Sequence, residues 1–149
     1  MAEAIGLVAS AIAIAEASIK LSQALFQISE TVIAARKELE ALASELVLFA
    51  SVLESIGDAL EAGQGLHSGE MLRTAEQVFH RCGTEFEEIR NEINLPIGRS
   101  IATWDRLRWT FQKPKAERLK ASLECSKTAL MLMLQTLCLA TSLQGLRCV

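Results

Sequence analysis

Apolar residues recur at alternating steps of three and four between residues 36 and 60, with charged residues between them. The apolar positions are Leu39, Leu42, Leu46, Phe49, Leu53, Ile56 and Leu60. This spacing places them on one side of an α-helix and the charges on the other. Such a helix is about 38 Å long, so its apolar stripe needs other helices of similar length to cover it.

Residues 69–94 repeat this spacing, and Ser68 can cap the start of the helix that they predict. The apolar positions are Leu72, Ala75, Phe79, Cys82, Phe86, Ile89 and Ile93. The charged residues Glu85, Glu87, Glu88, Arg90 and Glu92 lie outside this stripe. Gly83 is expected to weaken the helix by about 1 kcal/mol relative to Ala, unless close helix packing requires the missing side chain.

A third stripe follows Pro114, over residues 114–144. Its members are Leu119, Leu123, Ser126, Leu130, Met133, Leu137 and Ala140. Proline suits the first turn of a helix, where its missing N–H costs nothing. We therefore predict that this last helix begins at Pro114 and that a separate short helix, residues 100–111, precedes it.

Two segments are uncharged for most of their length. Residues 4–15 are apolar nearly all round, but they lack the basic region of a secretory signal and are too short for a membrane span of about 20 residues. Residues 128–146 are also uncharged, and Thr128, Gln135 and Ser142 recur among them every seven residues. We predict that both segments are bundle helices, the second of them buried rather than a transmembrane tail.

These patterns predict an all-α fold in one domain, residues 1–149, built as an antiparallel bundle of four to five helices. The expected helices span about 3–30, 34–61, 69–94, 100–111 and 114–144. The predicted shared core contains Leu39, Leu46, Phe49, Leu53, Phe79, Phe86, Ile89, Leu130 and Leu137. Because the first and last helices contain more uncharged surface than a small bundle can cover, self-association is also expected.

The net charge of -3 conceals a segregation of charge along the chain. Residues 1–96 carry 15 of the 18 acidic side chains, whereas residues 97–149 carry nine of the 15 basic ones. Acidic and basic helices of one bundle facing each other would explain this, and so would a basic surface for an anionic partner. With neither a recognition helix motif nor a sheet of exposed aromatic residues, an anionic membrane or an acidic neighbour fits better than nucleic acid.

The sequence contains no motif for catalysis, for a cofactor or for a metal. His67 lies in a glycine-rich loop and is predicted to be solvated, and His80 lies at a helix edge. The four cysteines are widely spaced and predict reduced, buried thiols in a cytosolic protein. They are Cys82, Cys125, Cys138 and Cys148. We therefore expect neither an enzyme nor a metal protein.

Two stretches together are similar to a known family. One is AEAIGLVASAIAIAEASIKLSQALFQI leading into RKELEALASELVLFASVLESI, and the other is RLRWTFQKPKAERLKASLECSKTALMLML. Their VLESI end, residues 52–56, and their basic W-x-F element, residues 109–111, resemble the HeLo-like N-terminal domains of fungal STAND (NLR-like) proteins. The resemblance implies a helical bundle similar to HeLo domains, to the four-helix domain of the necroptosis executor pseudokinase and, more loosely, to plant resistance-protein coiled-coil domains.

The resemblance also implies a cytoplasmic domain of a longer parent chain with a downstream nucleotide-switch module. Such domains oligomerise and are recruited to the plasma membrane when triggered, as part of regulated cell death. The membrane-insertion candidates are Ile5, Leu7, Val8, Ile12 and Ile14. The candidates for contact with anionic lipid are Arg106, Arg108, Lys113, Lys115, Arg118 and Lys120. A soluble module that signals through helix–helix assembly, without membrane activity, is the alternative.

Overall fold

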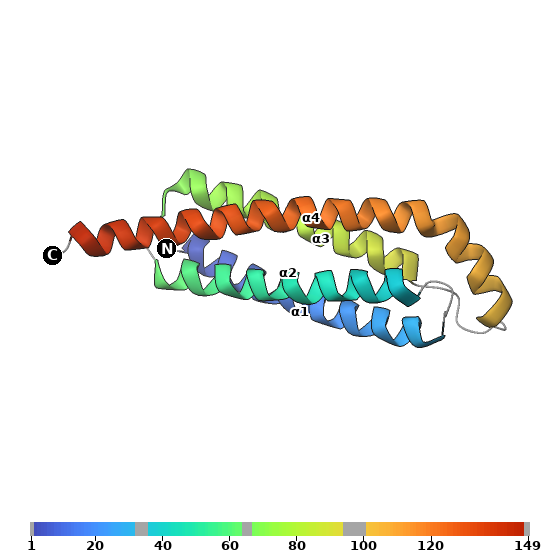
Figure 1. The fold of residues 1–149 in the computed structure, drawn as a ribbon. Helices are drawn as coiled ribbons and strands as arrows, with labels where there is room; N and C mark the ends of the chain where they lie inside the picture. Colours follow the sequence, from blue (N-terminus) through green and yellow to red (C-terminus); the bar gives the residue numbers. More distant parts are fainter. Residues whose placement is uncertain (1, 32–35, 64–66, 94–100, 148–149) are drawn as a thin grey trace.

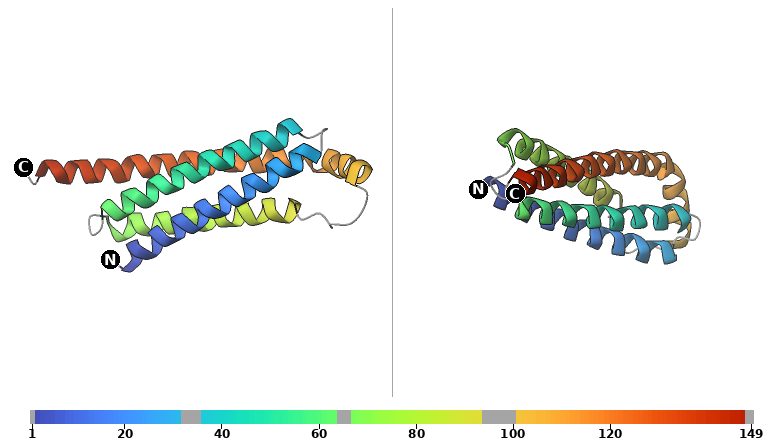
Figure 2. Two further views of the ribbon diagram at one scale, coloured as in Figure 1. Left: turned by 90° about the horizontal axis from the view of Figure 1, so that it is seen from below. Right: turned by 60° about the vertical axis from the view of Figure 1, so that its left-hand side comes forward.

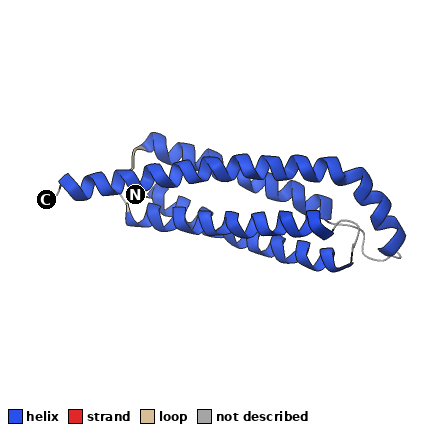
Figure 3. Cartoon of the chain, viewed as in Figure 1, coloured by secondary structure: helices blue, strands red, loops and turns tan. Residues whose placement is uncertain are grey.

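The computed structural model describes residues 2–31, 36–63, 67–93 and 101–147. Within these ranges it describes all side chains except those of residues 2–3, 31, 92–93, 101–113, 115–116 and 147. The described residues form four helices: α1 (Ala2–Thr31), α2 (Arg36–Ala62), α3 (Gly69–Ile93) and α4 (Ile101–Arg147). Helices pack against each other throughout, so the prediction of an all-α bundle is confirmed (Figures 1 and 3).

Successive helices run in opposite directions along the bundle (Figure 1). Helix α1 packs against α2 and α3, and α4 packs against the same two helices from the other side. The neighbours α1 and α3 are therefore parallel, as are α2 and α4, and the consecutive helices α2 and α3 lie diagonally opposite each other. The C-terminal end of α4 extends beyond the other three helices (Figures 1 and 2).

All nine residues of the predicted core lie in one buried cluster, which confirms that prediction. The cluster is centred on α2, where the side chains of Leu46 and Leu53 are completely buried. The rings of Phe49 and Phe86 meet edge to face, with centroids 5.4 Å apart and planes inclined at 70°. This aromatic contact joins the diagonal helices α2 and α3 through the middle of the core.

Helix α4 differs from the prediction, because it continues through Pro114 as a single helix of 47 residues. Proline inside a helix has no N–H to donate to the carbonyl four residues earlier, and its ring displaces that carbonyl. Such a defect kinks a helix without ending it when both flanks are held. Figure 1 shows α4 bending between its orange N-terminal part and the long straight part that packs on the bundle.

Two serines form hydrogen bonds that position helices: one joins α1 to α2, and the other caps α3. Ser18 of α1 is fully buried, and its Oγ donates a hydrogen bond of 2.6 Å to the backbone carbonyl of Leu46 in α2. This bond fixes the position of α1 along α2. Ser68 caps α3 as predicted, since its Oγ accepts a hydrogen bond of 3.2 Å from the backbone N–H of Met71.

His67, which lies between α2 and α3 in the sequence, packs against the end of α2. The imidazole of His67 lies directly over Gly63, where a Cβ would overlap the ring, and its Nε2 is buried. The prediction of a solvated His67 is therefore wrong. Gly63 also donates its N–H to the carbonyl of Ala59 at 3.0 Å, at the end of the helix. A side chain at position 63 would force the ring to move.

Replacement of Gly83 by Ala is expected to raise the free energy of unfolding by about 0.5 to 1 kcal/mol. A Cβ at Gly83 would meet nothing within 4 Å, so close helix packing does not require the glycine. Urea denaturation measures the change. Gly63→Ala is the matched control and is expected to destabilise, because its methyl group overlaps His67. Destabilisation by Gly83→Ala would contradict the open space seen beside residue 83.

Candidate functional site

The five membrane-insertion candidates of α1 lie in three different environments. Leu7 is buried in the core, whereas Val8 and Ile14 are half-buried and pack against it. Ile5 and Ile12 lie outside, with 58% and 49% of their surface exposed. The structure therefore places two of the five on the surface and three against the bundle.

The N-terminal half of α1 is attached to the core by small side chains. Ala4, Ala11 and Ala15 face the core together with Leu7. An alanine buries only a methyl group, so each contributes far less than a buried leucine. The C-terminal half is held by larger groups and by the hydrogen bond of Ser18. Removing residues 4–15 from the bundle thus costs less than removing the rest of α1.

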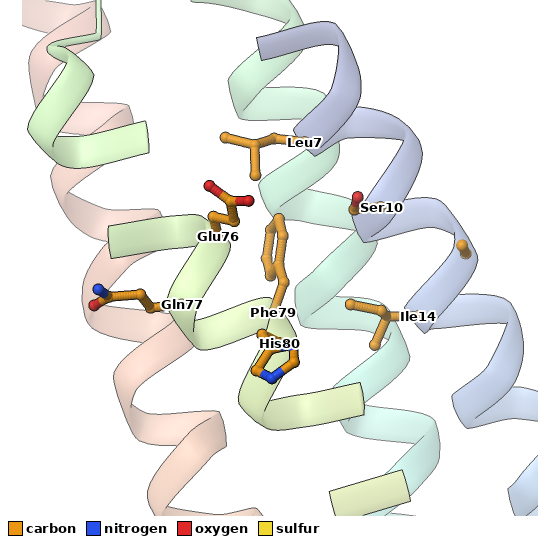
Figure 4. A pocket seen from close by; sticks show the side chains of 8 residues that line it. Leu7, Ser10, Ile14, Glu76, Gln77, Phe79 and His80 are labelled. Carbon is orange, nitrogen blue, oxygen red and sulfur yellow. The ribbon is translucent and has the colours of Figure 1, made fainter. Parts of the chain in front are cut away.

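A groove between α1 and α3 borders the same half of α1. It consists of two adjoining hollows of about 650 and 550 Å³, which share Leu7, Ser10 and Glu76 in their walls. Figure 4 shows these side chains with Phe79 and His80 of α3 around the first hollow. The side of α1 that faces α3 is therefore loosely packed. Sequence reasoning missed this groove, because periodicity does not tell how closely two helices approach.

Four of the six anionic-surface candidates have side chains outside the described residues: Arg106, Arg108, Lys113 and Lys115. Of the other two, Arg118 is exposed and Lys120 is half-buried on α4. The N-terminal part of α4 lies at the end of the bundle opposite the N-terminus of α1 (Figure 1). The structure therefore does not bring the two sets of candidates together in one patch.

One basic residue of α4 pairs with an acidic helix. Lys127 Nζ lies 2.8 Å from Glu45 Oε2 of α2, and both side chains are largely covered. This is the contact expected if acidic and basic helices face each other. At this position, the basic C-terminal part of the chain forms an ion pair with the acidic helix α2 within the bundle.

Glu85 was predicted to lie outside the α3 stripe, and this prediction is wrong. Its side chain is buried, and Oε1 accepts hydrogen bonds from Ser122 Oγ at 2.7 Å and from Ser126 Oγ at 3.0 Å. Arg81 Nε lies 3.4 Å from the same carboxylate. A buried carboxylate requires such partners, and α4 provides them. Ser126 within the predicted α4 stripe was the available signal.

The cysteines divide into two kinds. Cys82 is completely buried, and burial together with the nearby Glu85 carboxylate raises the pKa of its thiol to about 12. Cys125 and Cys138 are exposed on α4, so the prediction of buried thiols is wrong for these two. Cys148 lies outside the described residues. No group of three or more His, Cys, Asp or Glu side chains in the described part of the chain is placed to hold a metal ion.

The uncharged C-terminal segment, residues 128–146, has two different apolar faces. One faces the core through Leu130, Met133 and Leu137, as predicted. The other is exposed and consists of Met131, Leu132, Leu139, Leu143 and Leu146. The prediction of a buried helix therefore holds for only one side of α4.

Among the described residues, two helical segments are long and apolar enough, by length and composition, to cross a membrane. Ala4–Glu30 has a mean hydropathy of 1.7 and Glu117–Leu146 one of 1.5. Core helices also pass this test, but they are mostly buried. In the apolar 18-residue window of each segment, only 33% of the first and 17% of the second is buried. Their apolar surface is thus larger than the bundle covers.

Comparison with known proteins gives no relative: no family model, no curated protein and no solved structure matches the chain. The class of protein that fold and site define is a four-helix all-α bundle with excess apolar surface on α1 and α4.

Proposed function

We propose that the chain is a signalling domain of the HeLo-like kind, which assembles and acts on membranes through the N-terminal half of α1. The observation that carries this proposal is the weak attachment of residues 4–15. This segment is uncharged, is held mainly by alanines and borders a loosely packed groove. Residues 4–15 therefore combine an apolar surface with a low free-energy cost of detachment from the bundle.

At an anionic membrane, two gains in free energy oppose the native packing of this segment. Ile5 and Ile12 are already exposed, so inserting them among acyl chains sacrifices few native contacts and gains roughly 1 to 2 kcal/mol each. Each basic residue near anionic headgroups adds about 1 kcal/mol. The opposing term is the packing of Leu7 and the alanines. Oligomerisation or a trigger that loosens this packing then starts insertion.

Ser18 marks where the released segment ends. Its hydrogen bond to the carbonyl of Leu46 and the buried leucines beyond it keep the rest of α1 on α2. The basic N-terminal part of α4 lies at the other end of the bundle. In this proposal it recruits the domain to anionic lipid before α1 opens. The resemblance adds a cytoplasmic location and a nucleotide-switch module in a longer parent chain.

A disulfide between α1 and α2 tests the release step. A Cβ built at Gly57 lies 3.8 Å from the Cβ of Ala11, the separation that a disulfide needs. The variant Ala11→Cys with Gly57→Cys, made with the four native cysteines replaced by Ser, is expected to leave anionic vesicles intact when oxidised. Reduction is expected to restore dye leakage. The same protein serves as its own reference, because its dye leakage is measured before and after reduction.

The control is the cysteine-free protein treated with the same oxidant and reductant. It is expected to release dye from anionic vesicles in both states and to spare zwitterionic ones, with less leakage at high salt. Ile12→Asp is a second probe, since this exposed side chain can be changed without unfolding the bundle. Leakage by the oxidised variant equal to that of the control would reject insertion by α1.

The alternative is a soluble module that signals through helix–helix assembly. The exposed apolar face of α4 favours it, because this face lies on a different helix from residues 4–15 and is available for packing against another helix. Absence of leakage from the cysteine-free protein under every condition would leave this alternative as the better function.

A further inference from the structure

The exposed side of α4 contains a second stripe with regular spacing. Leu132, Thr136, Leu139, Leu143 and Leu146 follow one another at steps of four, three, four and three. We call these five residues the outer seam. This is the spacing by which one helix packs against another over several turns. The buried stripe of the same helix already packs against α2 and α3, whereas the leucines of the outer seam are exposed and do not contribute to the core of the bundle.

Hydroxyl groups along this side do not oppose its burial. Thr136 Oγ1 donates to the carbonyl of Leu132 at 2.9 Å, and Thr128 and Ser142 bond the carbonyls four residues before them in the same way. A hydroxyl whose donor is satisfied within its own helix can be covered without leaving a buried donor unpaired. The seam can therefore be buried against another apolar surface.

The charge of the segment indicates what covers it. Residues 128–146 contain no Asp, Glu, Lys or Arg on any side of the helix. Two copies of this segment can meet without like-charge repulsion, whereas a charged partner finds no complement here. A helix lying in a membrane interface normally flanks its apolar side with Lys or Arg, and within this segment α4 has none. A second copy of the chain fits better than either.

Geometry and area agree with a pair of seams. The C-terminal end of α4 extends beyond the other helices, so these do not flank this part of α4 (Figures 1 and 2). The four leucines of the seam and the adjacent Met131 expose roughly 500 Å² per copy, so two copies would bury on the order of 1,000 Å². This lies at the lower limit for a specific interface and indicates a reversible dimer.

We infer that the outer seam of α4 is a self-association surface, which packs against the outer seam of a second copy. The inference rests on the assembly step of the proposed function and names its surface. It concerns the protein without lipid, so it can succeed or fail independently of α1 and its insertion.

Sedimentation velocity over a range of protein concentrations, without lipid, tests this inference. The native chain is expected to show a reversible dimer at micromolar to high micromolar concentrations. The variant Leu139→Glu with Leu143→Glu places four carboxylates in the paired seams and is expected to raise the dissociation constant at least 100-fold. Leu48→Glu is the matched control, because Leu48 is as exposed as Leu143 but lies on α2. It is expected to dimerise like the native chain.

Three results would overturn the inference. The native chain could remain a monomer at high micromolar concentration, or the seam variant could dimerise as well as the control. The seam variant could also lose binding to vesicles while the native chain is monomeric, which would make the seam a lipid-binding face. Circular dichroism confirms that each variant is folded. Ile12→Asp is expected to dimerise normally, so failure of α1 insertion leaves this result unchanged.

Discussion

Replacement of Leu46 by Ala is expected to lower the free energy of unfolding by about 2 to 5 kcal/mol, the usual range for a fully buried leucine. The side chain is 0% exposed and lies in the middle of α2, the helix at the centre of the core. Its own carbonyl accepts the hydrogen bond from Ser18, so the cavity opens beside the contact that positions α1. Since a domain of this size is stable by only about 5 to 15 kcal/mol, the loss is large.

The chain offers a matched control for this substitution. Leu48 belongs to the same helix two residues later, and 54% of its surface is exposed. Leu48→Ala is expected to cost less than about 0.5 kcal/mol. Urea denaturation of both variants gives the comparison. Equal effects at the two positions would show that the α2 stripe does not face the core.

Replacement of Glu85 by Ala is expected to cost about 2 to 3 kcal/mol, because hydrogen bonds to a charged group are among the stronger ones. The change removes the acceptor for Ser122 and Ser126 and the partner of Arg81. It also leaves a cavity between α3 and α4. The serine hydroxyls can turn to carbonyls of their own helix, as Thr128 does, which keeps the cost below that of an unpaired buried charge.

Glu85→Gln separates the hydrogen bonds from the charge. The amide oxygen still accepts from the serines, so this variant is expected to lose about 1 kcal/mol, mainly from the contact with Arg81. Glu88, three residues later, is exposed, and Glu88→Ala is the control with an expected change below about 0.5 kcal/mol. If Glu85→Ala were as mild as Glu88→Ala, the cluster would contribute nothing to the docking of α4.

The fold was largely predictable because two of the helices, α2 and α3, have a single apolar stripe over most of their length. Leu39 to Leu60 of α2 and Leu72 to Ile89 of α3 lie in the core as their spacing indicated. Pro114 is predicted to begin a helix, but α4 continues through it. Whether a proline begins or kinks a helix depends on packing on both sides, which is not contained in the local sequence.

The candidate site was less predictable, for two physical reasons. Residues 4–15 are apolar nearly all round, so the spacing could not tell the buried Leu7 from the exposed Ile5 and Ile12. In α3, Glu85 lies at the edge of its stripe, where a carboxylate is buried only if another helix supplies donors. Ser122 and Ser126 lie about 40 residues away in the sequence, and only the tertiary structure brings them to it.

The pairing of α1 with α2 has a consequence for how the chain reaches and leaves this structure. These two helices form the most extensive contact in the bundle, and only residues 32–35 separate them in the sequence. Contacts between near neighbours in sequence cost little loop entropy and form early in folding. We therefore expect folding to begin with the pair of helices that the proposed insertion must partly separate. In the proposed function, the step that opens α1 would reverse this early folding event, so we expect activation to be slow without a trigger.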